Sequence, residues 1–141
     1  AEFAIYRDLS AAFLEVVQAQ NVLFPNSLVD RVPKDKQEQK AFYMKRANKC
    51  GEAYNNAVKQ LYCSAPFIDE HIFEQFDKIR NGVWEQLSKY PIFFTSDDAS
   101  QNRKDFNDEF KECYQRTQDI NGDMDKLISD LRAYLKKLDV A

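Results

Sequence analysis

Glycine and proline are scarce in this chain, whose 141 residues include three glycines and four prolines. A β-rich domain needs many more turn-forming residues, so the composition favours helices. The glycines Gly51, Gly82 and Gly122 also stand far apart in the sequence. A phosphate-binding loop needs glycines close together, because several backbone N–H groups must approach the phosphate. The sequence therefore predicts a helical protein without a nucleotide-binding loop.

Residues that bind metals or act as nucleophiles are also few. The chain has an odd number of cysteines, Cys50, Cys63 and Cys113, and no two of them have C-x-x-C spacing. This pattern argues against a disulfide framework and a zinc site. His71 is the single histidine, and neither a G-x-S-x-G motif nor the Glu-x-x-His pairs of di-iron bundles are present. We therefore predict no enzymatic activity, no cofactor, and no catalytic, cofactor-binding or metal-binding residues, with Cys50 and Cys113 buried in the core. An enzyme would require His71 to lie in a cleft beside a neighbouring acid or a cysteine.

Long apolar runs and a strong net charge are missing as well. No run of apolar residues approaches the roughly twenty that span a bilayer. The net charge of −3 argues against nucleic acid or anionic lipid as the main partner. The chain opens with Ala1-Glu2-Phe3 and enters a helical pattern at once, without a signal peptide or a capping residue. We expect a single domain over 1–141 that is a fragment of a longer chain.

Apolar residues recur at spacings of three and four along four segments, which is typical of amphipathic helices. The segments span about residues 3–24, 35–63, 69–89 and 97–138. Asp69 and Ser96 are suitable N-caps for the third and fourth segments, and Pro66 disfavours continuation of the second. The sequence predicts an all-α fold, an antiparallel up-down four-helix bundle with a long C-terminal helix.

Two places leave the helix boundaries open to question. Asn121-Gly122 ordinarily suggests a turn, but the apolar spacing continues across it in phase. We therefore predict one continuous helix through Gly122. The string 92–95 (IFFT) follows Pro91 and is apolar, so we expect it to lie outside the helix and against the bundle.

The last predicted helix is much longer than the first, at about 60 Å against about 30 Å. In an up-down bundle the outer termini of these two helices lie at the same end, so the last helix should project past Ala1. The projecting apolar residues would then form an exposed strip that recruits an upstream segment or a second copy of the chain. The predicted partner-binding residues, with self-association through the C-terminal helix, are Leu127, Leu131, Tyr134, Leu135 and Leu138.

Charge is distributed unevenly along the chain. Residues 31–49 carry seven basic and two acidic side chains, whereas residues 97–130 carry ten acidic and five basic ones. The basic block, which includes Phe42 and Tyr43, could contact RNA, DNA or an anionic membrane. We favour a solvated helix start that pairs electrostatically with the acidic last helix, because exposed ion pairs are common in bundles.

Three segments carry a resemblance to other proteins: 2–9 (EFAIYRDL), 23–25 (LFP) and 65–74 (APFIDEHIFE). Their sequence resembles a loose group of uncharacterised bacterial membrane-anchored helical proteins. In that group, such a domain looks like the soluble part that follows a transmembrane segment and a coiled coil. The resemblance implies no activity and no catalytic residue.

These observations lead to a functional hypothesis. We expect a non-enzymatic interaction or scaffold domain that is the cytoplasmic part of a membrane-anchored bacterial protein. Its expected partner is a protein and not a nucleic acid. We expect it to contact the membrane only through a segment outside this chain. The alternative is a sensor domain that binds a small ligand between helices. A pocket that holds several of the polar residues Gln18, Gln20, Asn21 and Thr117 would favour this alternative.

Overall fold

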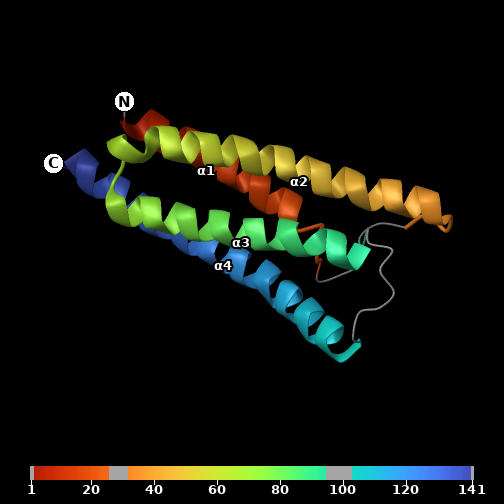
Figure 1. The fold of residues 1–141 in the computed structure, drawn as a ribbon. Coiled ribbons are helices and arrows are strands. Elements are labelled where there is room, and N and C mark those ends of the chain that lie inside the picture. The colour runs from red at the N-terminus through yellow and green to blue at the C-terminus, as the bar shows by residue number, and fades with distance from the viewer. Residues whose placement is uncertain (1, 26–31, 95–102, 141) are drawn as a thin grey trace.

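The computed structural model describes residues 2–25, 32–94 and 103–140. These residues form four α-helices, α1 (Glu2–Gln20), α2 (Lys36–Ser64), α3 (Glu70–Phe94) and α4 (Arg103–Val140), and a short 3-10 turn, η1 (Ala65–Phe67). The helices run alternately up and down, so that both chain ends lie at one end of the bundle (Figure 1). α1 contacts the other three helices, α2 packs on α3, and α3 packs on α4. The predicted all-α antiparallel bundle with a long C-terminal helix is confirmed.

Two aspartates fix the starts of the middle helices. The Asp35 carboxylate accepts a hydrogen bond from the backbone N–H of Glu38 at 3.1 Å, and Asp69 accepts one from Ile72 at the same distance. Such caps satisfy N–H groups that have no partner within their own helix. The Tyr6 hydroxyl on α1 also accepts a hydrogen bond from the Asp69 N–H at 2.9 Å. The start of α3 is thereby tied to α1.

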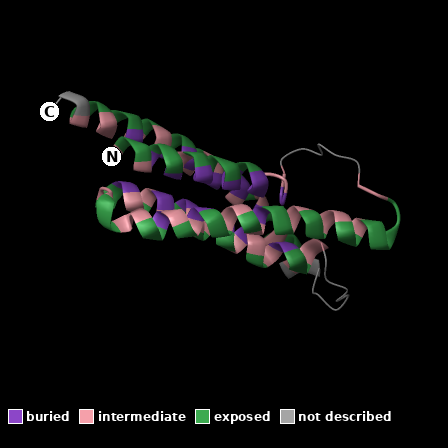
Figure 2. Ribbon diagram, turned by 90° about the horizontal axis from the view of Figure 1, so that it is seen from above, coloured by how far each residue is buried: buried purple, intermediate pink, exposed green. Residues whose placement is uncertain are grey.

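The described part of the helices buries a continuous apolar core. Figure 2 shows the buried residues on the inward faces of the helices and the exposed ones on the outside. Cys50 and Cys113 are buried, as predicted, whereas Cys63 is exposed. Gly122 lies within α4, so the predicted continuous helix is confirmed. Within the described residues, no helix has an apolar stretch long enough to cross a bilayer.

The predicted end of the third helix is wrong. α3 continues through Pro91 to Phe94, so residues 92–94 are helical rather than an apolar loop, and Thr95 lies outside the described residues. A proline inside a helix removes one backbone hydrogen bond and crowds the preceding turn. Here the extra turn brings the rings of Phe93 and Phe94 to 5.8 and 5.7 Å from the ring of Phe24. Aromatic packing of this kind offsets the cost of the proline.

The first helix is shorter than predicted and ends at Gln20. Residues 21–25 leave the helix, yet Leu23 and Phe24 are almost completely buried. The predicted start of the last helix, residues 97–102, lies outside the described part of the chain. We call the end of the bundle that holds both termini the terminal end, and the opposite end, where α1 stops early, the open end.

Figure 1 shows the end of α4 reaching past the start of α1, as predicted, but the expected exposed apolar strip is not found on it. Leu127 and Leu131 are 0 and 6% exposed, and Tyr134 and Leu135 pack against the core at its edge, while Leu138 is half-buried. Asn121 on α4 contacts Asn21 at the end of α1, and Tyr134 contacts Glu2 at its start. α1 therefore spans only the stretch of α4 between these contacts. Most of the length by which α4 exceeds α1 lies at the open end. The predicted exposed apolar strip at the terminal end therefore does not form.

The ion pairs of the acidic helix differ from the expected ones. Among the described residues, pairs from α4 to another helix reach α3, through Lys78–Asp123, Lys89–Glu109 and Arg116–Glu85. Figure 1 shows why these pairs form with α3: α2 and α4 diverge toward the open end, where α2 begins. The basic start of α2 therefore lies away from the acidic part of α4.

Candidate functional site: an aromatic cavity at the open end

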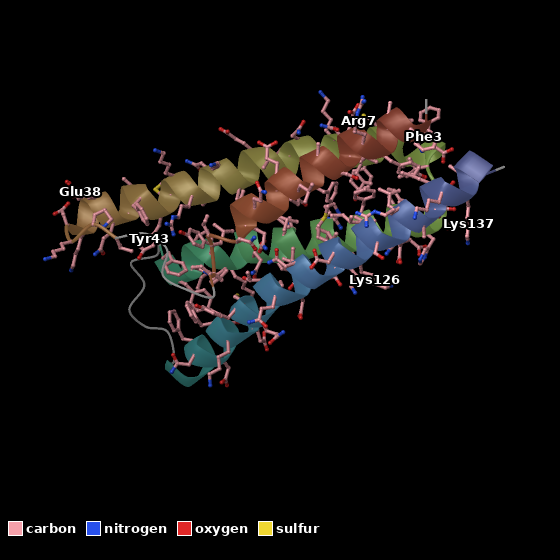
Figure 3. All side chains as sticks on the ribbon, turned by 180° about the vertical axis from the view of Figure 1, so that it is seen from behind. Phe3, Arg7, Glu38, Tyr43, Lys126 and Lys137 are labelled. Atoms are coloured by element: carbon pink, nitrogen blue, oxygen red, sulfur yellow. The ribbon has the colours of Figure 1, made fainter. Side chains whose placement is uncertain are left out.

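The early end of α1 leaves the open end of the bundle to be filled by the connection after it. Phe24 fills this space, with its ring 5.7 to 5.9 Å from the rings of four residues on α3 and α4. Tyr43 on α2 adds a further ring, 4.8 Å from Phe94, and Figure 3 shows it projecting toward the end of α3. The aromatic cluster thus formed at the open end comprises Phe24, Tyr43, Tyr90, Phe93, Phe94, Phe106, Phe110 and Tyr114.

A cavity lies within this cluster. Its volume is about 150 Å³, and it is partly enclosed. Five rings line it, from Tyr43 on α2, Tyr90 and Phe94 on α3, and Phe110 and Tyr114 on α4. The connection after α1 contributes aliphatic residues, among them Val22 and Leu23. Protein interiors contain few voids larger than a water molecule, so a space of this size between packed helices is a candidate binding site.

Tyr90 and Arg46 are two of the polar side chains at this largely apolar cavity. Tyr90 is 1% exposed, and its hydroxyl has no hydrogen-bond partner in the part of the chain that the structure describes. Burial raises the pKa of this hydroxyl, which therefore keeps its proton at neutral pH; the positive charge of Arg46 opposes this rise in pKa only in part. Arg46 lies over the Phe42 ring at 4.3 Å and donates a hydrogen bond to the Val22 carbonyl at 3.2 Å.

A buried polar network is hydrogen-bonded to Phe24 of the aromatic cluster. The Gln86 amide on α3 donates hydrogen bonds to the Thr117 hydroxyl at 3.0 Å and to the Cys113 carbonyl at 2.8 Å. The Thr117 hydroxyl in turn donates to the Phe24 carbonyl at 2.8 Å. Arg116 binds the Gln86 side-chain oxygen at 3.1 Å, so each end of the Gln86 amide is held. This network fixes Phe24 against α3 and α4.

The structure does not gather the polar residues that the sequence suggested for a ligand. Thr117 belongs to the network that holds Phe24, Gln20 donates a hydrogen bond to Asn21 at 2.8 Å, and none of the three is among the residues that line the cavity. Gln18 lies on a separate surface groove between α1 and α2. The aromatic cavity is therefore not the pocket of polar residues that would have favoured the sensor alternative. The apolar string 92–95 is the sequence signal for the aromatic cavity, since the rings of Phe93 and Phe94 belong to the aromatic cluster.

The residues considered for an enzyme take other roles. His71 is exposed on the first turn of α3, and the Asp69 carboxylate caps that helix. Among the described residues, no three or more His, Cys, Asp and Glu side chains are grouped so that they could hold a metal ion.

The predicted partner-binding residues border a different surface feature. At the terminal end a shallow groove between α1 and α4 is lined by Phe3, Tyr6, Leu131 and Leu135, among others. Phe3 is 51% exposed, and Figure 3 shows it projecting from the first turn of α1. Tyr134 closes the α1–α4 contact beside the groove, where its hydroxyl donates to the Glu2 carboxylate at 3.0 Å.

Comparison with known protein families, curated proteins and solved structures found no match to this chain. The resemblance to bacterial membrane-anchored helical proteins therefore stays a prediction.

Proposed function

We propose that this chain is a ligand-binding helical domain, in which a small aromatic molecule occupies the cavity at the open end. The observation that supports this function is the cavity of about 150 Å³ lined by five aromatic rings. An apolar cavity of about this volume in another protein remains dry and binds benzene. A single aromatic ring therefore matches the space and would gain contacts with the rings that line it.

The position of the cavity supports a sensing role for this binding. It is lined by residues of α2, α3, α4 and the connection after α1. An occupant therefore contacts all four chain segments that meet at the open end. A molecule that binds better when these segments are packed together shifts the population toward the packed arrangement.

Toluene is a suitable probe of the proposal. Binding to the folded state raises the midpoint of thermal unfolding by an amount that grows with toluene concentration. We expect this rise for the wild-type chain and its loss in Val22→Phe, because the added ring occupies the cavity from the connection. Leu14→Phe is the matched control, since it adds the same ring at an exposed position of α1. A wild-type chain that toluene does not stabilise contradicts the proposal.

A second proposal is an interaction or scaffold domain that self-associates at the terminal end. The exposed Phe3 and the groove beside it support this function, because in a two-fold dimer Phe3 of each copy can enter the groove of the other. A cytoplasmic location and anchoring in a bacterial membrane belong to this second proposal. They require a hydrophobic stretch in the full-length gene product, which its sequence would reveal.

Sedimentation distinguishes this second proposal from a monomeric domain. We expect the wild-type chain to dimerise at high concentration and Leu135→Glu to reduce dimerisation, since Leu135 lines the groove and is only half-buried. Met44→Glu places the same charge at an exposed position of α2, away from the groove, and should leave the dimer intact. Leu131 is unsuitable for this test, because it is buried and a glutamate there would unfold the core.

A further inference from the structure

Arg46 on α2 is the feature of the cavity that bears on the choice of ligand. Among the described residues that line the cavity, it alone carries a charge at neutral pH. Its guanidinium donates a hydrogen bond to the backbone carbonyl of Val22, another lining residue, at 3.2 Å, and lies over the Phe42 ring at 4.3 Å from the centroid. Arg46 is half-buried. These contacts hold its charge at the edge of the cavity, where the side chain meets both the lining and solvent.

The chemistry of this group narrows the ligand class. A guanidinium stays protonated at neutral pH and carries five N–H donors in a planar fork that matches a carboxylate, so one guanidinium can bind a carbonyl and a carboxylate together. The charges nearby have the same effect. Residues 32–49 carry six basic and two acidic side chains, and Glu109, next to the lining residue Phe110, pairs with Lys89. The α2 side of the cavity therefore favours an anionic group.

The partial exposure of this edge allows an anion to bind there. A carboxylate enclosed in an apolar cavity would lose its hydration at a large cost in free energy. The cavity is only partly enclosed and Arg46 is half-buried, so a carboxylate beside the guanidinium keeps part of its hydration. An aromatic ring attached to that carboxylate fills the apolar space.

Resting on the proposed function, we infer that the cavity takes a single-ring aromatic carboxylate, whose ring packs among the aromatic residues of α2, α3 and α4 while its carboxylate pairs with the Arg46 guanidinium. Arg46 is then the residue that determines specificity. The remaining lining residues supply apolar contact and size selection.

Benzoate and benzamide form a matched pair for the test, because they have nearly the same shape but only benzoate is charged at neutral pH. Their dissociation constants are measured by titration calorimetry, at one salt concentration, with the wild-type chain and with Arg46→Gln, which removes the charge. Comparing the ratio of the two affinities between the proteins cancels the different hydration of the two ligands. We expect the affinity for benzoate relative to benzamide to fall about five- to tenfold in Arg46→Gln, the effect of one hydrogen-bonded ion pair.

Lys45→Gln is the matched control, since Lys45 is exposed and does not line the cavity. It removes the same charge one position away and should leave the ratio nearly unchanged, and Arg46→Lys, which retains the charge, should keep most of it. If toluene binds the wild-type chain but benzoate does not, the inference is overturned while the proposed function stands. The same holds if Arg46→Gln leaves the ratio unchanged or if Lys45→Gln lowers it equally. If the wild-type chain binds none of the three compounds, both fail.

Discussion

The hydroxyl of Thr117 on α4 donates a hydrogen bond to the backbone carbonyl of Phe24, a residue 93 positions earlier in the chain, at 2.8 Å. The same hydroxyl accepts a hydrogen bond from the Gln86 amide on α3. One small side chain therefore joins the connection after α1 to two helices. Phe24 is completely buried, so its carbonyl has little access to water that could replace this bond.

Replacing Thr117 by valine should destabilise the fold. Valine has nearly the same shape but leaves the Phe24 carbonyl without its partner, and a buried polar group left unsatisfied costs about 1–3 kcal/mol. Urea unfolding should show a decrease of this size in the free energy of unfolding. Thr117→Ser retains the hydroxyl and should recover most of the loss. A Thr117→Val variant as stable as the wild type would mean that the hydrogen bond to the Phe24 carbonyl contributes little to stability.

Replacing Tyr90 by phenylalanine should stabilise the unliganded chain. The substitution removes a buried hydroxyl that lacks a partner among the described residues, with little change in ring packing. We expect the free energy of unfolding to rise by about 1 kcal/mol. Chemical denaturation in the absence of ligand measures the change. A loss of stability would indicate that the hydroxyl of the free protein is hydrogen-bonded, for example to a bound water.

Gly82 and Gly122 should respond differently to alanine. A Cβ at Gly122 meets nothing within 4 Å, so alanine there should stabilise α4 by up to about 1 kcal/mol through its higher helix propensity. A Cβ at Gly82 would lie 3.0 Å from the Cγ1 atom of Ile120, where α3 and α4 approach closely. Gly82→Ala should therefore destabilise the fold or gain clearly less. Thermal unfolding of the two variants compares them, and equal stabilisation would contradict the close helix contact.

The three cysteines should react with a thiol reagent at very different rates. Cys63 is exposed, while Cys50 and Cys113 are buried. Burial also raises the pKa of Cys50 to about 12, so that even at pH 9 it remains a thiol, which is the unreactive form. Absorbance assays should show one rapidly modified cysteine in the folded chain and three after unfolding. Rapid modification of Cys50 would reopen a reactive role for it.

Much of the fold can be predicted because helical periodicity records which face of each helix is buried. The unbroken apolar spacing across Gly122 is an example. The N-cap at Asp69 is a second kind of local signal, which marks where a helix begins. The position of α4 along the bundle could not be predicted in this way, because helix length does not say at which end the surplus lies. The continuation of α3 through Pro91 depends on the burial of Phe93 and Phe94 against Phe24, which no local pattern reveals.

The cavity was harder to predict than the fold. Its rings come from separate segments, and their spacing marks them as core residues without indicating that they pack incompletely. The unpartnered state of the Tyr90 hydroxyl likewise depends on neighbours that are distant in sequence. The apolar composition of residues 92–95 does indicate that they pack against the bundle. This is the local sequence signal for the aromatic cavity.

The early end of α1 gives the two halves of α4 different neighbours. From Asn121 to Tyr134, α4 faces α1, whereas from Phe106 to Thr117 it meets the connection after α1 and the end of α3. Helices open locally where fewer buried contacts hold them, so a single continuous helix can have regions of unequal stability. Backbone amides of the half nearer Phe106 should therefore exchange with solvent deuterium sooner than those near Leu127. A molecule bound among the aromatic residues would reduce this difference, so that amide exchange along one helix reports on occupancy at the open end.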